Sequence, residues 1–145
     1  MVVLVMSLER FLKAQEGDYE IALSEIRAGR KQSHWIWYIF PQLKGLGRSG
    51  TSEYYGIDGM EEAKAYLKNP VLRGRLVEIS EALLGLASDD ADDVMGFPDN
   101  LKLRSSMTLF ALAEPDCKVF QKVLDKFFGG KMDERTMELL HAKKP

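Results

Sequence analysis

Histidine is the side chain whose charge changes near neutral pH, and the chain contains two histidines, His34 and His141. His34 stands at the head of the stretch SHWIWYIFPQ (33–42). If the protein performs acid–base chemistry, His34 is the best candidate for the catalytic group, with Glu53 as its carboxylate partner. The alternative is a structural histidine that donates a hydrogen bond at the start of a helix. No Ser-His-Asp arrangement can be recognised, so the sequence leaves open whether the protein is an enzyme.

The same stretch contains both tryptophans of the chain, Trp35 and Trp37. A tryptophan ring offers a stacking face for a planar ligand, and the amide of Gln42 offers both a donor and an acceptor. The opposing interpretation is that these aromatic side chains simply form the core. Ser33 is a good N-cap, and Pro41 ends any helix that precedes it. The stretch is therefore predicted to be a short buried helix.

A glycine-rich segment, KGLGRSGTSEYYGI (44–57), follows directly. Its N–H groups are suited to wrap an anion, with Arg48 supplying charge and Ser49 and Tyr55 supplying hydroxyl groups. The segment does not match the P-loop pattern GxxxxGK[ST], and no strand precedes it. The alternative is an ordinary surface loop between two helices.

A second arginine, Arg104, lies beside Ser105 in LKLRSSMTLF (101–110). The helix predicted there is apolar enough to be central, so the Arg104 charge requires an anionic partner. That partner is either a ligand or a carboxylate of the protein, for which the candidates are Asp99, Asp133 and Glu53.

Together these features predict a pocket for a small anionic ligand that is nucleotide-like or otherwise phosphorylated. The tryptophans, Arg48 and Arg104 are expected to meet there, although they are far apart in the sequence. The candidate ligand-binding residues are Trp35, Trp37, Gln42, Arg48, Ser49, Tyr55, Arg104 and Ser105.

The elements that must position these residues are helices. After Pro70, apolar residues repeat at spacings of four and three, at Leu72, Leu76, Ile79 and Leu83. Asp58 with Glu61 resembles a capping box, and Asp133 is placed to cap the last helix. No strand-like alternation of useful length occurs. The sequence predicts an all-α, single-domain bundle of about seven helices over residues 6–145, with residues 1–5 as an N-terminal extension.

Composition restricts the partners. The net charge is −2 and charged residues make up 29% of the chain, as in an ordinary globular protein, so neither nucleic acid nor a membrane is an expected partner. A single cysteine and two distant histidines argue against a metal site, and no cofactor is indicated. The short apolar start lacks the pattern of a signal peptide, so a cytoplasmic location is expected. No protein partner can be named.

Four strings resemble the DUF1810 family, a bacterial family of unknown function that is sometimes labelled calpastatin. They are SLERFLKAQ (7–15), GRKQSHWIWYIFPQLKGLG (29–47), DNLKLRSSMTLFALAEPD (99–116) and FFGGKMDERTMELL (127–140). The resemblance covers the chain from Met6 onward and implies a compact all-α domain without an established activity. Calpastatin regions are disordered and repetitive, which this chain is not. Two functions therefore stay open: a protein that binds a small anionic molecule, and a non-enzymatic interaction module with a purely structural aromatic core.

Overall fold

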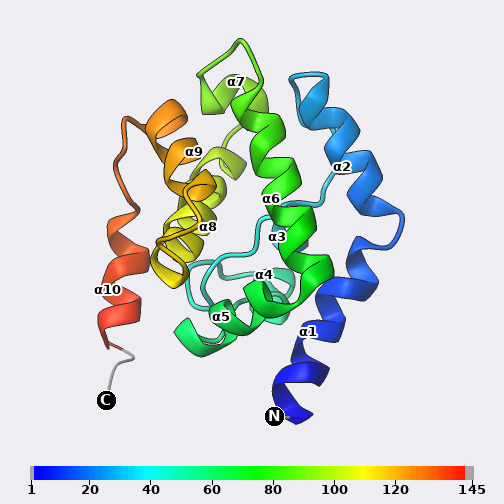
Figure 1. Cartoon of the computed structure of the whole chain (residues 1–145), viewed down its shortest axis with the longest axis vertical. Coiled ribbons are helices and arrows are strands. Elements are labelled where there is room, and N and C mark those ends of the chain that lie inside the picture. Colours follow the sequence, from blue (N-terminus) through cyan, green and yellow to red (C-terminus); the bar gives the residue numbers. More distant parts are fainter. Residues whose placement is uncertain (1, 143–145) are drawn as a thin grey trace.

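A computed structural model describes the backbone of residues 2–142 and the side chains of residues 8–142. Within this part of the chain every regular element is a helix, and the only strand-like feature is an isolated parallel bridge between Leu43 and Ile57. The all-α prediction is confirmed. The helices, labelled in Figure 1, are α1 (Val2–Gln15), α2 (Asp18–Arg27), α3 (Ile36–Ile39), α4 (Gly50–Tyr54), α5 (Met60–Lys68), α6 (Pro70–Leu84), α7 (Ala91–Met95), α8 (Asp99–Ala113), α9 (Val119–Phe128) and α10 (Glu134–Ala142).

The prediction of about seven helices is wrong, because residues 2–142 contain ten. The short buried helix predicted within residues 33–42 is confirmed as the four-residue α3. The difference lies in α4 and α7, which have five residues each. One turn of helix is too short for an apolar period to repeat, so spacing alone does not reveal it. Helix α4 lies inside the segment 44–57, which the sequence analysis treats as an irregular glycine-rich loop.

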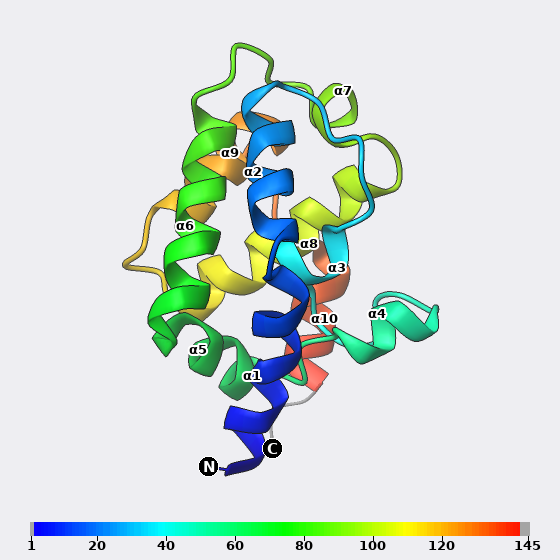
Figure 2. The ribbon, with the colours of Figure 1, turned by 90° about the vertical axis from the view of Figure 1, so that its right-hand side faces the viewer.

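Helix α8 runs through the middle of the molecule (Figure 2). It packs against α5, α7, α9 and α10, and its Leu103, Met107 and Phe110 are completely buried. The start of α8 lies nearer the surface, where Leu101 is exposed. The first turn of α8 can therefore present polar side chains to solvent, and the buried part of the helix keeps that turn in a fixed position.

Helix α6 has the ends and the buried face that the sequence predicts. Pro70 occupies its first turn, and the Asn69 side chain caps it by accepting hydrogen bonds from the N–H groups of Val71 and Leu72 at 3.0 and 3.1 Å. The apolar residues at spacings of four and three are all buried: Leu72, Leu76, Ile79 and Leu83.

The predicted capping box at Asp58 and Glu61 is wrong. Helix α5 begins later, at Met60, and its N-cap is Gly59 without a side-chain hydrogen bond. The neighbouring carboxylate of Glu62 accepts the Asp58 N–H at 2.8 Å instead. The backbone of α1 already begins at Val2, so this helix continues through the suggested boundary after residue 5. The extension itself stays a prediction.

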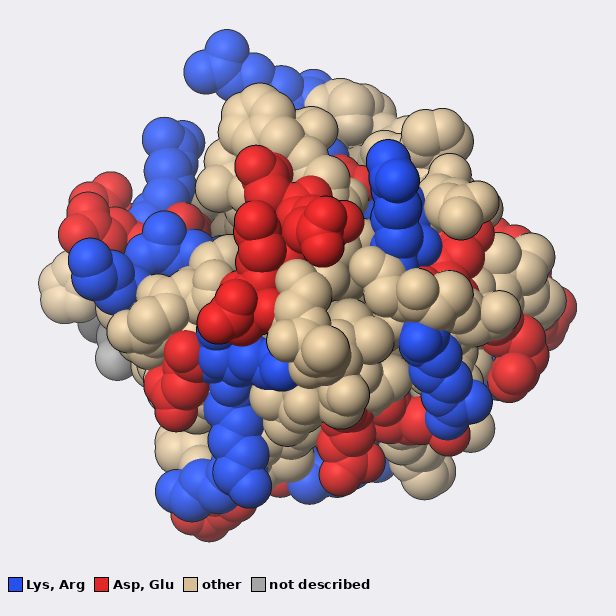
Figure 3. Space-filling model, turned by 90° about the horizontal axis from the view of Figure 1, so that it is seen from above, with Lys and Arg blue, Asp and Glu red and all other residues tan. Residues whose placement is uncertain are grey.

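The surface carries charges of both signs. On the face seen from above in Figure 3, acidic and basic side chains are interspersed, so this face has no continuous basic patch. Among the described helices, none combines the length and the apolar character that crossing a membrane requires.

Candidate functional site

Trp35 belongs to the core of the protein. It is 1% exposed, and its indole N–H donates to Glu25 Oε1 at 2.9 Å. The Glu25 carboxylate also accepts hydrogen bonds from the N–H groups of Gln32 and Ser33 and from the Ser33 hydroxyl. Ser33 therefore does not cap α3 as predicted, and the N-cap position is Trp35 itself. A ring this deeply buried offers no open face for a ligand.

The hydrogen bonds to Glu25 affect its titration. Partial burial raises the pKa of the carboxyl, but hydrogen bonds from Ser33, Gln32 and Trp35 outweigh this and lower the pKa to about 2. Glu25 is thus ionised over the physiological range and fixes the chain that leads into α3.

Three charged side chains, Lys31, Asp99 and Lys102, lie next to Trp35. The Lys31 side chain is 5% exposed, and its Nζ atom lies 2.8 Å from Asp99 Oδ2 and 4.8 Å from the centroid of the Trp35 ring. Lys102 Nζ lies 3.7 Å from the other carboxylate oxygen of Asp99. One carboxylate therefore serves two lysines. Because Lys31 makes the closer contact, the incompletely balanced charge is that of Lys102.

Lys102 lines a cavity of about 250 Å³, which we call the Gln42 cavity. It is open to solvent and is lined by the segment 42–47, the start of α8 and the start of α10. Its apolar lining consists of Leu46, Gly47, Pro98 and Leu101, and its polar lining consists of Gln42, Lys102, Ser105, Asp133 and Arg135. Residues from three distant parts of the sequence thus meet at one polar hollow.

The Gln42 amide is the unusual group in this cavity. The residue is 8% exposed, and its side chain makes no hydrogen bond with any described residue. Among the described residues, the fully buried side-chain atoms without a partner are Trp37 Nε1, Asn100 Oδ1 and Ser106 Oγ, so the Gln42 amide is reached by solvent in the cavity. Since the side chain lines the cavity, a ligand there can supply the missing partner.

Gly47 is essential to the shape of this wall. A Cβ atom at this position would lie 2.4 Å from Ser52 Oγ and 3.4 Å from Gln42 Nε2. No side chain therefore fits where the segment passes α4. The Gly47 N–H donates to no group among the described residues, which leaves a backbone donor available beside the amide.

The segment that carries Gly47 is fastened at both ends. The Lys44 N–H donates to the Ile57 carbonyl at 2.8 Å, and the Ile57 N–H donates to the Gln42 carbonyl at 2.9 Å. Farther along, Ser49 caps α4 by accepting the Ser52 N–H at 3.1 Å. The glycine-rich segment is thus an ordered wall rather than a free loop.

Asp133 forms the opposite side and uses only one of its carboxylate oxygens. Its Oδ2 atom accepts hydrogen bonds from Ser105 Oγ at 3.2 Å, from the Thr136 N–H at 3.0 Å and from Thr136 Oγ1 at 2.5 Å. The predicted N-cap of the last helix is confirmed by the bond from Thr136 N–H. The Oδ1 atom accepts no hydrogen bond from the described residues, so it is available to a donor in the cavity.

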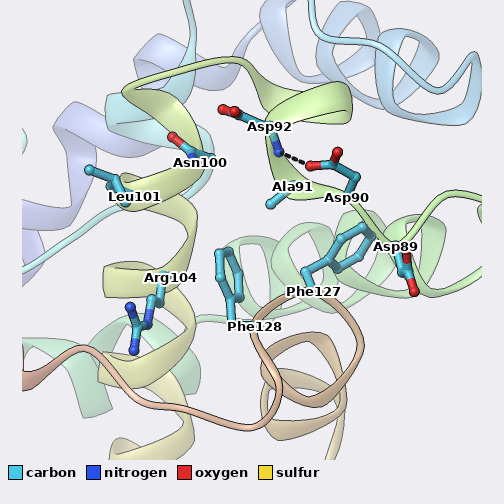
Figure 4. Close-up of a pocket in the computed structure, with 9 residues that line it drawn as sticks. All are labelled: Asp89, Asp90, Ala91, Asp92, Asn100, Leu101, Arg104, Phe127 and Phe128. Atoms are coloured by element: carbon cyan, nitrogen blue, oxygen red, sulfur yellow. Dashed lines mark hydrogen bonds between the residues drawn. The ribbon is translucent and has the colours of Figure 1, made fainter.

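Arg104 lies at a different hollow. This second cavity measures about 530 Å³ and contains Arg104 on one side and the aspartates from Asp89 to Asp92 on the other, with the rings of Phe127 and Phe128 between them (Figure 4). Within it, Asp90 Oδ1 accepts the Asp92 N–H at 3.0 Å, as a normal cap of α7.

The predicted ion pair between Arg104 and Asp99, Asp133 or Glu53 is wrong. The guanidinium donates from Nε to the Lys131 carbonyl at 3.0 Å and from Nη2 to the Met132 carbonyl at 3.1 Å. No carboxylate among the described residues pairs with it. Backbone carbonyls therefore take the place of the anion.

The residues predicted as site residues are distributed over several places. Gln42 and Ser105 lie together at the Gln42 cavity, and Arg104 lies at the second cavity. Neither of these two cavities is lined by the other candidates, which are His34, Trp35, Trp37, Arg48, Ser49, Glu53 and Tyr55.

Two of these candidates, Trp37 and Tyr55, are half-buried and make ring contacts. Lys102 Nζ lies 5.4 Å from the centroid of the Trp37 ring, and the Trp37 indole N–H is buried without a partner among the described residues. Tyr55 packs at a ring-centroid distance of 5.2 Å from Tyr38 and 4.8 Å from Tyr54.

The remaining candidates are at the surface. His34, Arg48, Ser49 and Glu53 are exposed. No hydrogen bond or ion pair joins His34 to Glu53 among the described residues, so the geometry adds nothing to the case for acid–base catalysis by this pair.

Lys102, Asp133 and Arg135 line the Gln42 cavity but are not among the candidate site residues predicted from the sequence. Lys102 precedes Ser105 by three positions, a spacing that places both on one helical face. Arg104 was grouped with Ser105 because the two are adjacent, although adjacent residues point about 100° apart on a helix. The i, i+3 spacing from Ser105 could have identified Lys102. No sequence pattern relates Arg135 to the other residues of the cavity. No group of three or more potential metal ligands is found in the described residues.

The fold and the site define a small all-α protein with a polar cavity between the starts of two helices. The chain belongs to a family described as "Protein of unknown function (DUF1810)", whose model matches residues 5–140. The recognition made from the four strings is thereby confirmed. The chain is also similar to a crystal structure of the conserved hypothetical protein Rv1873 from Mycobacterium tuberculosis, with 45% sequence identity and a TM-score of 0.90. The match covers 92% of this chain and 96% of that one. No curated protein matches the chain.

Proposed function

We propose that the protein binds a small anionic ligand in the Gln42 cavity. The observation that carries the proposal is the Gln42 amide, which lines the cavity on a residue that is 8% exposed and has no hydrogen-bond partner among the described residues. A ligand in the cavity can hydrogen-bond this amide in place of solvent and so make a specific contact.

The charge of the lining favours an anion. Lys102 shares its carboxylate partner with the more closely held Lys31, and Arg135 forms no ion pair with the described residues. Two cationic side chains whose charge is not fully balanced by a carboxylate thus line the same hollow as the amide. Arginine and lysine bind carboxylates and phosphates through charge-assisted hydrogen bonds, which are about twice as strong as neutral ones.

The size of the hollow favours a small molecule. Water occupies about 30 Å³ per molecule in the liquid, so a cavity of about 250 Å³ corresponds to roughly eight waters. None of its lining residues is aromatic. A nucleotide, which the sequence analysis considers, would have no ring to stack on here. A compact metabolite fits the hollow better.

The experiment is a thermal melt against a panel of small phosphates and carboxylates. A ligand present at a hundred times its dissociation constant adds about 2.7 kcal/mol of stability to the wild-type protein. The Gln42→Leu variant keeps the size of the side chain and removes the amide. We expect it to melt at or above the wild-type temperature without ligand, and to lose the ligand-induced shift.

Arg48→Ala is the matched control, because Arg48 is an exposed cation on the same segment that does not line the cavity. It should leave both the melting temperature and the ligand shift unchanged. If Gln42→Leu is strongly destabilised, or keeps the full ligand shift, Gln42 is a structural residue and the proposal fails.

The second candidate function is a protein-interaction module. Phe97, which precedes α8, and Leu101, in its first turn, are 75% and 47% exposed, which is high for large apolar side chains. Under this alternative no small anion stabilises the protein, and the cavity is only a space between helices.

A further inference from the structure

The inference concerns the chemical class of the ligand, and it rests on the proposed function. We infer that the ligand is a small monocarboxylate that carries a hydrogen-bond donor, a hydroxyl or an ammonium group, next to its carboxylate. The cavity offers cations for the carboxylate, and the Asp133 carboxylate in its lining offers a separate acceptor for the donor.

The acceptor is Asp133 Oδ1. The other oxygen of this carboxylate accepts two hydrogen bonds from Thr136 and lies 3.2 Å from Ser105 Oγ, whose single proton is shared with the Leu101 carbonyl at 3.1 Å. These bonds fix the orientation of the carboxylate, because rotation would break all of them. The free Oδ1 atom is thus held in place on the cavity wall, ready to accept a hydrogen bond. A ligand without a donor at this position would leave a negative oxygen facing its own anionic group.

The charges at the site limit the charge of the ligand. Three cations, Lys31, Lys102 and Arg135, stand with two carboxylates, Asp99 and Asp133, on and directly behind the cavity wall. One positive charge is left over. The monoanion of a hydroxy acid balances it, and a zwitterionic amino acid leaves it unchanged while its ammonium group faces Asp133. A phosphate dianion exceeds it and also lies beside the Asp133 carboxylate, where like charges repel.

The Gln42 amide completes the recognition of a carboxylate. Its –NH2 group is a donor, as is the Gly47 N–H on the same wall. A planar carboxylate can accept from these neutral donors with one oxygen and from a cation with the other. With the ligand carboxylate bound in this way and its neighbouring donor on Asp133 Oδ1, each unpaired polar group named above has a partner.

The test measures four dissociation constants by NMR titration of the full-length protein, with propionate, L-lactate, L-alanine and inorganic phosphate as probes. Propionate, lactate and alanine have the same carbon skeleton and differ at the carbon next to the carboxylate. We expect lactate or alanine to bind about tenfold more tightly than propionate, because a hydrogen bond to a charged group is gained. Phosphate should bind more weakly than the better of these two.

The discriminating variant is Asp133→Asn. Its amide oxygen can replace Oδ2 as the acceptor from Thr136, and asparagine is an equally good N-cap, so the fold is expected to persist. The –NH2 group then stands where Oδ1 stood, and a donor replaces the acceptor. The preference for lactate or alanine over propionate should disappear, and phosphate should bind more tightly than to the wild type. Asp133→Ser, which also preserves a capping oxygen, provides a second variant if Asp133→Asn does not fold.

The outcomes separate the inference from the proposed function. If phosphate is the tightest probe for the wild type, or if propionate binds as well as lactate and alanine, the inference is overturned while anion binding stands. If both Asp133 variants still prefer lactate or alanine over propionate, a residue other than Asp133 accepts the ligand's hydrogen bond, and the inference is again overturned. If none of the four probes binds, the inference is wrong, and the wider panel with Gln42→Leu decides the proposed function separately.

Discussion

Glu25 illustrates how one side chain can hold a whole segment in place. It collects hydrogen bonds from Gln32, Ser33 and Trp35, and thereby fixes the chain that leads to α3 and to Gln42. The low pKa of its carboxyl, about 2 compared with the ordinary 4.5, is the thermodynamic expression of these bonds.

A depressed pKa has a defined consequence for stability. The contribution of Glu25 is fully present above pH 4.5 and is lost as the pH falls through about 2. Glu25→Gln should therefore be less stable than the wild type at neutral pH by about 1–3 kcal/mol, since hydrogen bonds to a charged acceptor are weakened. Thermal melts over this pH range should show the difference shrinking as the pH falls. Glu16→Gln, at an exposed position, is the control. A difference that stays constant with pH would contradict the account.

Arg104 is expected to be structural. Its guanidinium holds the carbonyls of Lys131 and Met132 and so fixes the connection between α9 and α10. Arg104→Ala should lower the free energy of unfolding by about 1–3 kcal/mol, equally with and without an anionic ligand. Denaturant unfolding measures this directly.

Arg135→Ala is the counterpart at the Gln42 cavity. Arg135 is exposed, so its loss should leave stability unchanged while reducing the ligand-induced stabilisation. If Arg104→Ala instead abolished the ligand effect without altering the fold, the ligand would lie at the second cavity, as the sequence analysis first expected for this arginine.

At the scale of elements, the segment from Gln42 to α4 depends on close backbone packing. Gly47→Ala places a Cβ atom 2.4 Å from Ser52 Oγ, and overpacking of this kind costs about 1–3 kcal/mol. Gly50→Ala is the matched control, because nothing lies within 4 Å of its added Cβ. The second substitution should be close to neutral in a thermal melt.

A second substitution, at Ser52, should relieve the clash caused by Gly47→Ala. The atoms that a Cβ at Gly47 would meet most closely are Cβ and Oγ of Ser52, so Ser52→Gly should recover part of the stability lost in Gly47→Ala. If the double variant is as unstable as the sum of the single variants, the close approach at Gly47 is not the cause.

The elements also show which parts of the fold were predictable from the sequence. Helix α6 was found because its buried leucines and isoleucine repeat over about three turns behind Asn69 and Pro70. Helices α4 and α7 were missed because five residues cannot display a period. Caps were predicted correctly at Asp133 and incorrectly at Asp58, where a side chain beyond the expected position, Glu62, takes the N–H.

At the scale of the whole molecule, the site could be predicted only in part. Gln42 was selected because a buried amide needs a partner, and it does lie at a cavity. Its neighbours Lys102 and Arg135 come from α8 and α10, about sixty and ninety positions away in the sequence. Their approach is decided by how α8 packs against α10, which local patterns do not encode. The aromatic stretch attracted attention as a binding wall, yet Trp35 is part of the core that supports the site.

The central claim is that the Gln42 amide is unpaired in the free protein and becomes paired when an anion binds. Proton–nitrogen NMR observes this amide directly, and the side-chain signals that disappear in Gln42→Leu assign it. On titration with L-lactate, these signals should move in a saturable way, with the same dissociation constant as the backbone signal of Gly47. Gln42 signals that stay fixed throughout the titration, while the melting temperature of the protein rises, would contradict the account and place the ligand elsewhere.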